Sequence, residues 1–225
     1  MACKQWHDLP AEETKNRGTF ENPPDISFNT YKLVRMREEV IDGKLRWLFF
    51  PEQCRHCTEP PCLETAEDPS AIFKDSATGA IIFTANTKHL NADDIISSCP
   101  YNIPRKAADG TLAKCDMCLD RLQNGLLPAC VQTCPTGSMN FGDRNEMLDL
   151  AQKRLAVVKN NLSPQAQIID ADDVRVIYLV AYSPDKYYKN AMASNSIESM
   201  TRKMAMRKIF SPLTRAASHL IQPSV

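Results

Sequence analysis

The feature that most constrains this chain is the crowding of its cysteines. The sequence contains nine cysteines, and all but one of them lie between Cys54 and Cys134. That segment is rich in proline and shows little of the periodicity that predicts helices or strands on a hydrocarbon core. An odd number of cysteines grouped in C-x2-C pairs is a poor match to a disulfide framework. We therefore expect the segment to fold around metal.

The first cysteine run reads CRHCTEPPCLETAEDP. Cys54, Cys57 and Cys62 follow the spacing C-x2-C-x4-C, and Ala66 stands where a bacterial ferredoxin run has its fourth cysteine. Cys99 has the opposite feature: it is followed by proline, as the fourth cysteine of a ferredoxin run is, but no cysteine lies just upstream of it. In two-cluster ferredoxins the fourth cysteine of each run binds the cluster of the other run. We interpret Cys99 as the fourth ligand of the cluster held by the first run.

The positions for the other cluster of this pair have lost their cysteines together. Counting back from Cys99 with the ferredoxin spacing gives His89, Ala92 and Ile95, and Ala66 is the fourth position. The four positions without cysteine would all serve one cluster, and the four retained cysteines would all serve the other. This pattern favours the loss of one whole site and the retention of the other. His89 is expected to be a surface residue.

A second constellation follows in CDMCLDRLQNGLLPACVQTCPTG. Cys115, Cys118 and Cys130 are predicted to hold a second cluster, with Cys3 as the fourth ligand. Cys134, which precedes a proline, would serve a third cluster if an upstream segment carries its partners, or would substitute for Cys3. We expect such an upstream segment, because its omission explains both the isolated Cys3 and the stranded Cys134.

Structural zinc is the alternative interpretation of the C-x2-C pairs, because zinc sites use similar spacing. Such a protein would be a zinc-stapled scaffold with no redox role. The two Cys-Pro endings and the joint loss of four positions favour iron–sulfur clusters.

Several residues beside the cysteines leave alternatives open. His56 either donates a hydrogen bond toward a cluster or faces solvent, and Arg55 and Lys114 either offset the negative charge of thiolate-bound iron or are solvated charges. Trp6 and Trp47 are expected to be core or interface anchors.

Composition argues against other functions. Lys+Arg and Asp+Glu both number 27, so the net charge of zero gives no electrostatic footprint for nucleic acid. The chain has seven glycines and no pattern resembling a nucleophile–base pair, a pterin site or a Gly-rich phosphate loop. We therefore expect no catalytic site in this chain.

Periodicity predicts a few regular elements. Residues 30–36 and 44–50 are predicted to form a hairpin through an Asp-Gly turn, and residues 79–84 a further short strand. Residues 144–162 predict an amphipathic helix, and residues 173–182 a buried strand. The apolar face of the helix comprises Met147, Leu148, Ala151, Leu155 and Val158.

The C-terminal segment carries basic residues and no acidic residue after Glu198. Residues 197–220 predict a short amphipathic helix that docks on an acidic partner or a membrane surface. A solvated, disordered tail is the alternative.

The motifs together resemble the iron–sulfur (β) subunits of formate dehydrogenases, most closely the soluble periplasmic type that contains tungsten or molybdenum. The resemblance rests on PEQCRHCTEPPC, CPYNIPR, KCDMCLDRLQNGLLPACVQTCPTGSMNFGD and ACKQWHDLPAEET. It implies an α+β fold of two ferredoxin-like [4Fe-4S] modules, one inserted in the other, with small β-hairpins and a C-terminal helix and strand. The expected domains are a first module at 1–52 and 111–143, an inserted module at 53–110, a helix-strand extension at 144–190 and a basic tail at 191–225.

The resemblance also implies a function. A non-catalytic subunit of this kind passes electrons from a catalytic Mo/W-bis-pterin α subunit through two [4Fe-4S] clusters, or three with an upstream segment. A multihaem cytochrome c, a membrane cytochrome subunit or another acceptor receives them. Export to the periplasm together with a catalytic subunit that carries a twin-arginine signal is implied, with the cytoplasm as the alternative. The runner-up function is the equivalent subunit of a nitrate, sulfoxide or polysulfide reductase.

Overall fold

This structure is a computed structural model, and it describes residues 1–193. The helices are α1 (Ala2–Trp6), α2 (Pro61–Ala66), α3 (Ala92–Ser98), α4 (Leu119–Gln123), α5 (Ala129–Gln132) and α6 (Arg144–Asn161), with 3-10 turns η1 (Ala85–His89) and η2 (Pro184–Lys186). The strands are β1 (Leu33–Ile41), β2 (Lys44–Glu52), β3 (Ile72–Lys74), β4 (Ile81–Phe83), β5 (Arg105–Lys106), β6 (Leu112–Ala113), β7 (Gln167–Ile169) and β8 (Tyr178–Val180). They pair in chain order into two-stranded antiparallel sheets. The architecture is the predicted mixture of helices and small hairpins, and the amphipathic helix predicted in the tail lies outside the described residues.

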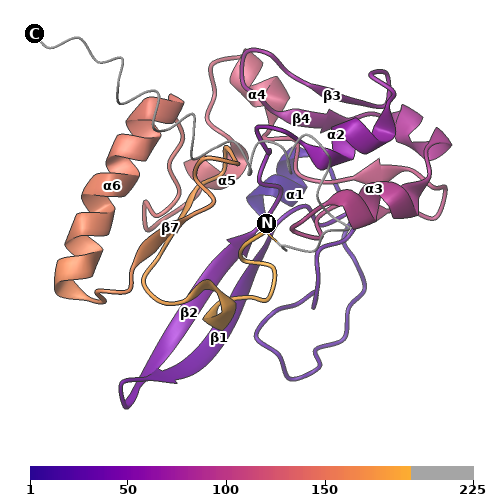
Figure 1. Cartoon of the computed structure of the whole chain (residues 1–225). Coiled ribbons are helices and arrows are strands. Elements are labelled where there is room, and N and C mark those ends of the chain that lie inside the picture. Colours follow the sequence, from indigo (N-terminus) through magenta and orange to yellow (C-terminus); the bar gives the residue numbers. More distant parts are fainter. Residues whose placement is uncertain (194–225) are drawn as a thin grey trace, which may run out of the picture.

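The β1–β2 hairpin projects from the body of the molecule (Figure 1). Its turn residues Asp42 and Gly43 have φ angles of 52° and 71°, as a tight two-residue hairpin turn requires. Alternate side chains of a strand point to opposite faces, so Phe50 is buried whereas Trp47 is 58% exposed. Trp6 is also exposed, at 42%, so neither tryptophan belongs to the core, and the alternative that they are interface anchors stays a prediction.

A first core joins the hairpin to the C-terminal part of the chain. Phe50 stacks on Tyr178 with ring centroids 4.7 Å apart, and the surrounding core residues include Ile169 and Val180. Burial of this apolar surface is what holds β7 and β8 against the hairpin.

The predicted strand over residues 173–182 is only partly correct. Ladder pairing is confined to β8, whereas Val174 forms a bridge with Cys57 and the N–H of Val176 donates to the carbonyl of Arg55 at 3.0 Å. The irregular cysteine loop has backbone groups that need partners, and this segment supplies them instead of continuing the sheet.

Helix α6 matches its prediction closely. The five residues of the predicted apolar face are half-buried, while most of the other α6 side chains are exposed. The helix packs against β7 and flanks the molecule as its one long helix among the described elements (Figure 1).

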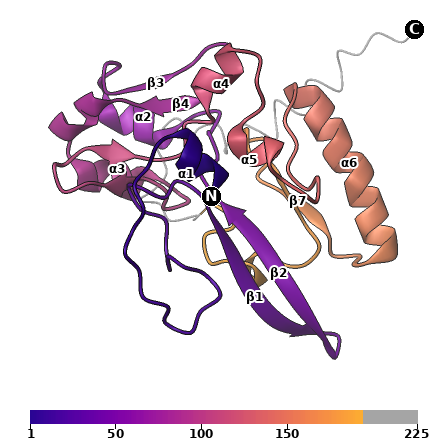
Figure 2. The same ribbon diagram turned by 180° about the vertical axis from the view of Figure 1, so that it is seen from behind.

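A second core organises the region between the first cysteine run and β6. Helices α2 and α3 pack together there, beside the β3–β4 hairpin, as both views show (Figures 1 and 2). Its buried residues are Cys62, Ala66, Ala71, Ile72, Ile81, Ala92, Ile95 and Leu112. One cysteine of the first run thus belongs to an apolar core, which fixes the position of its thiol.

Candidate metal centres

The four cysteines assigned to the first cluster surround one cavity. This first set comprises Cys54, Cys57, Cys62 and Cys99. The space between them has a volume of about 340 Å³, which includes its open mouth. The remaining lining residues are Arg55, Pro60, Pro61, Ile81, Pro100, Tyr101, Ile103, Pro104 and Lys114. The structure therefore brings the distant Cys99 to the three cysteines of the first run.

The loops that carry the thiols turn their backbone N–H groups toward sulfur. His56 and Met117 occupy the same place in the two C-x2-C loops, and both have a left-handed φ, of 48° and 64°. Their N–H groups donate to the sulfurs of Cys54 and Cys115, each at 3.4 Å. Such amide nests suit a negatively charged thiolate group. The loops are thus shaped for bound metal.

Burial raises the pKa of three thiols of the first set. It raises the pKa of the Cys62 thiol to about 12 and of the Cys99 thiol to about 11. Burial, followed by the charges of Cys54, Cys99 and Cys62, holds the pKa of Cys57 well above its usual value. Thiolates packed this closely need a cationic core between them, because each disfavours ionisation of the next.

Two cations beside the first set are buried, so the alternative that Arg55 and Lys114 are solvated charges is wrong. Arg55 is 2% exposed and Lys114 is 6% exposed, and both line the cavity. Neither forms an ion pair with a carboxylate among residues 1–193. A buried cation of this kind is costly unless an anion lies nearby. The site therefore suits a group of net negative charge.

His56 is completely buried, which rules out the alternative that it faces solvent. Its Nδ1 accepts a hydrogen bond from the N–H of Ile81 at 2.9 Å, so the ring proton is assigned to Nε2. Nε2 is buried and has no hydrogen-bond partner among the described residues. Burial, followed by the charges of Lys114 and Arg175, holds the pKa of His56 well below its usual value. The neutral ring positions the β4 backbone beside the cavity.

The second set comprises Cys3, Cys115, Cys118 and Cys130, and the structure brings these four together as well. Helix α1 packs against α5, which places Cys3 beside Cys118 and Cys130. Burial, followed by the charges of Cys118 and Cys130, raises the pKa of Cys3 to about 12. Burial also raises the pKa of Cys118 to about 11.

His7 lies beside the second set, and the sequence analysis missed it. Its Nε2 lies 3.7 Å from the sulfur of Cys118 and 3.4 Å from a carboxylate oxygen of Asp116. The ligand atoms of these three residues all lie within 4.8 Å of one another. The available signal was spacing, because His7 directly follows α1 and lies four residues after Cys3, so its N–H donates to the carbonyl of Cys3 at 3.1 Å.

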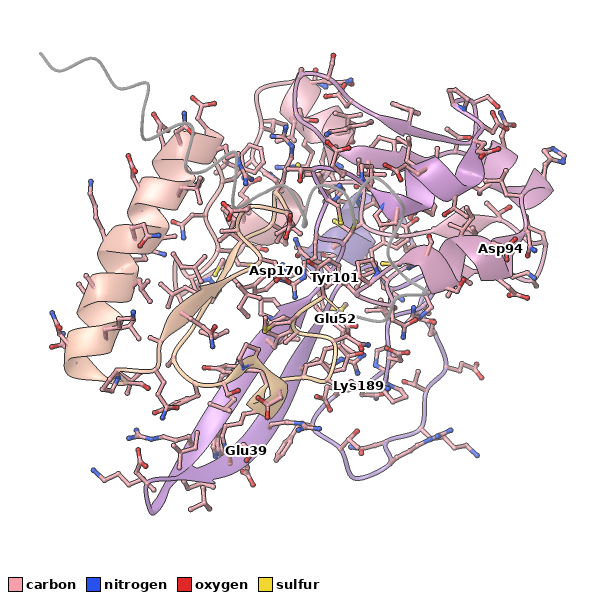
Figure 3. All side chains as sticks on the ribbon, in the orientation of Figure 1. Glu39, Glu52, Asp94, Tyr101, Asp170 and Lys189 are labelled. Carbon is pink, nitrogen blue, oxygen red and sulfur yellow. The ribbon has the colours of Figure 1, made fainter. Side chains whose placement is uncertain are left out.

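The two sets are neighbours. Burial, followed by the charge of Cys54 from the first set, holds the pKa of Cys115 in the second set well above its usual value. Tyr101, which lines the first cavity, packs in the same cluster as both cysteines and donates to Asp170 at 2.9 Å. Figure 3 shows Tyr101 and Asp170 together near the centre of the molecule. Two metal groups held by these sets would lie side by side in the interior.

Cys134 belongs to neither set. Its sulfur contacts the hydroxyl groups of Thr136 and Ser138, both at 3.4 Å. These hydroxyls lower the pKa of the Cys134 thiol to about 6. The structure places Cys3, and not Cys134, beside Cys118 and Cys130.

Three of the four positions assigned to the lost cluster are buried in an apolar core, and the fourth is exposed. Ala66, Ala92 and Ile95 are 9%, 5% and 1% exposed and belong to the second core, where apolar side chains fill the space. His89 is exposed, which confirms the surface position predicted for it. This half of the region is organised by packing.

The donor chemistry of both sets is the same. Four cysteine sulfurs select soft metals, namely iron–sulfur clusters, zinc or copper(I). The buried cations and the amide nests add positive potential, which suits a core with four thiolates and a net negative charge. The residues therefore fit [4Fe-4S] clusters.

Within residues 1–193, the structure contains no helix with the length and apolar character that a membrane span requires.

Comparison with known families identifies the class. Residues 45–144 match the family described as "4Fe-4S dicluster domain". This range contains the first set and three members of the second set. The match indicates that the chain contains an iron–sulfur domain of the [4Fe-4S] type.

Similar proteins narrow the class to one enzyme. The chain is 56% identical to the formate dehydrogenase subunit beta of Megalodesulfovibrio gigas, over 86% of this chain and 91% of that protein. It is 48% identical to the "formate dehydrogenase 2 subunit beta (cytochrome c-553)" of Nitratidesulfovibrio vulgaris, over 85% and 90%. It is 34% identical to the nitrate-inducible formate dehydrogenase iron–sulfur subunit of Escherichia coli, over 84% and 65%. The chain belongs to the family of formate dehydrogenase β subunits, the iron–sulfur electron-transfer subunits of that enzyme.

Proposed function

We propose that the first set and the second set each hold one [4Fe-4S] cluster, and that the two clusters carry electrons through this subunit. The observation that carries the proposal is the cavity lined by all four cysteines of the first set, which come from two distant segments. A [4Fe-4S] cluster accepts and releases one electron at a potential that its protein surroundings set. The residues of this chain supply the thiolates, exclude water and provide the charges and amide groups around the sulfurs.

We further propose the direction of transfer. Electrons from formate arrive from a catalytic α subunit that carries the Mo/W-bis-pterin site and leave to a cytochrome. The name of the N. vulgaris relative, which includes cytochrome c-553, supports an acceptor of that type. We also propose that residues 53–110 form one module, which is inserted in a second module made of residues 1–52 and 111–143. One electron path then passes through both sets.

Formate is expected to reduce the clusters of this chain in the purified complex. The broad visible absorption should bleach when formate is added under anaerobic conditions, as it does with dithionite. The complex carrying Cys118→Ala is the control. The difference between its formate-induced absorption change and that of the wild type is due to a cluster of this subunit and not to the catalytic subunit. Zinc in place of iron, or a dithionite-reducible signal that formate leaves unchanged, contradicts the proposal.

We also propose that the subunit works in the periplasm, exported with its catalytic partner. After separation of periplasmic and cytoplasmic fractions, the subunit and formate-dependent dye reduction should be recovered together in the periplasmic fraction. Recovery of both with a cytoplasmic marker would rule this out.

A further inference from the structure

We propose that the ammonium group of Lys114 is the counter-charge of the cluster held by the first set and raises the reduction potential of that cluster. The inference rests on the proposed function, because it assigns a role to one residue toward a cluster in that cavity. Lys114 is a positioning residue in this scheme, since it acts on the cluster through its charge and is not a ligand.

The position of Lys114 is fixed by the backbone around the two sites. Its Nζ donates to the carbonyl of Ile81, at the start of β4, and to the carbonyl of Cys115 at 3.1 Å. The side chain lines the cavity with the four thiols of the first set, and Lys114 precedes Cys115, a member of the second set. The ammonium group is therefore held close to the thiols of the first set.

The charge of Lys114 has no anionic partner within the described part of the chain. Its Nζ contacts two carbonyl oxygens and the ring of Phe83, whose centroid lies 4.7 Å away. Arg35, another buried cation, differs from Lys114 because it forms ion pairs with Asp25 and Glu52. A 6% exposed ammonium group with only neutral partners is expensive in isolation. A negatively charged group in the adjoining cavity removes that cost.

Arg55 lines the same cavity but has more partners. Its guanidinium lies over the rings of Tyr178, Tyr101 and Phe50, with centroid distances of 3.9, 4.9 and 5.0 Å. It also donates to the carbonyl of Ala191 at 2.7 Å. Replacing Arg55 would disturb the first core, whereas Lys114 allows its charge to be tested with less disturbance of packing.

The sign of the effect follows from electrostatics. Reduction adds one negative charge to the cluster, so a fixed positive charge nearby stabilises the reduced form more than the oxidised form. The interaction is strong because the site is buried and the local dielectric constant is low. Removing the charge therefore lowers the reduction potential.

The test is an anaerobic redox titration of the complex, followed by electron paramagnetic resonance. Signals are first assigned with Cys62→Ala and Cys118→Ala, which remove one cluster each. Lys114→Gln removes the charge but keeps N–H donors for the carbonyls of Ile81 and Cys115. We expect the first-set cluster to shift to lower potential, and Lys114→Arg, which keeps the charge, to stay near the wild type. Lys106→Gln is the matched control at an exposed lysine and should leave both potentials unchanged.

The outcomes are distinct. An unshifted or raised potential in Lys114→Gln, or an equal shift in Lys106→Gln, overturns the proposal. If Lys114→Gln fails to assemble the cluster, retention of the cluster in Lys114→Arg supports a role for the charge, and its loss in both variants overturns it. Absence of signals assignable to this subunit in the wild-type complex would instead refute the proposed function, so the two failures can be told apart.

Discussion

Replacement of Cys99 by alanine is expected to remove the same cluster as replacement of Cys57, although the two residues belong to different cysteine runs. Both thiols line one cavity, so the loss of either leaves the same core with three ligands. Each variant should lose about four irons per chain and the same paramagnetic signal. Iron analysis and electron paramagnetic resonance of the purified complex provide the measurement.

The matched control for this pair is Cys118→Ala, which changes a thiol of the second set. It should remove a different signal and leave the signal of the first set in place. If Cys57→Ala and Cys99→Ala lose different signals, the crossover assignment is wrong. Both variants should also be less resistant to unfolding, because metal binding at such sites contributes directly to folding free energy.

The proximity of Cys99 to the first cysteine run could be predicted from sequence, because cluster ligation imposes a fixed spacing. Cys99 and Cys54 are far apart along the chain, yet the ferredoxin pattern specifies which distant cysteine completes which run. The β1–β2 hairpin and helix α6 were predictable for a similar reason, since a turn signal and a clear apolar period are local features.

The surroundings of the thiols could not be predicted in the same way. Arg55, His56 and Lys114 look like ordinary polar neighbours in the sequence, and only the packing of β4, Tyr101 and Tyr178 around them determines their burial. His7 approaches Cys118 because α1 packs on α5, a contact that no local pattern encodes.

The predicted strand at 173–182 failed for a related reason. Its β-branched residues favour extended structure, but the chain bends at Arg175 and Val176 and forms a strand only over Tyr178–Val180. However, the backbone donors of Arg175 and Val176 pair with the irregular loop around Arg55 instead of a neighbouring strand. The demand of the cysteine loop for hydrogen-bond partners outweighs the local preference for a sheet.

Ile95→Ala is expected to lower the free energy of unfolding by about 2–5 kcal/mol, because it opens a cavity in the second core. Ile95 is 1% exposed and lies on α3, and it shares the second core with Ala92 of α3 and Ala66 of α2. Denaturant unfolding of the cluster-loaded protein, followed by circular dichroism under anaerobic conditions, measures the change. Val157→Ala on α6 is the control, because that side chain is 57% exposed and its truncation should change stability by about 0.5 kcal/mol or less.

The comparison tests what holds this half of the inserted region together. No cysteine stands at Ala66, Ala92 or Ile95, so this part of the region needs a source of stability other than a cluster, and these buried residues supply it only if their packing is tight. Equal effects of Ile95→Ala and Val157→Ala would mean that the surviving cluster of the first set alone organises the region. A larger effect of Ile95→Ala, with the iron content unchanged, would mean that hydrocarbon packing has taken over the structural role that a second cluster has in two-cluster ferredoxins.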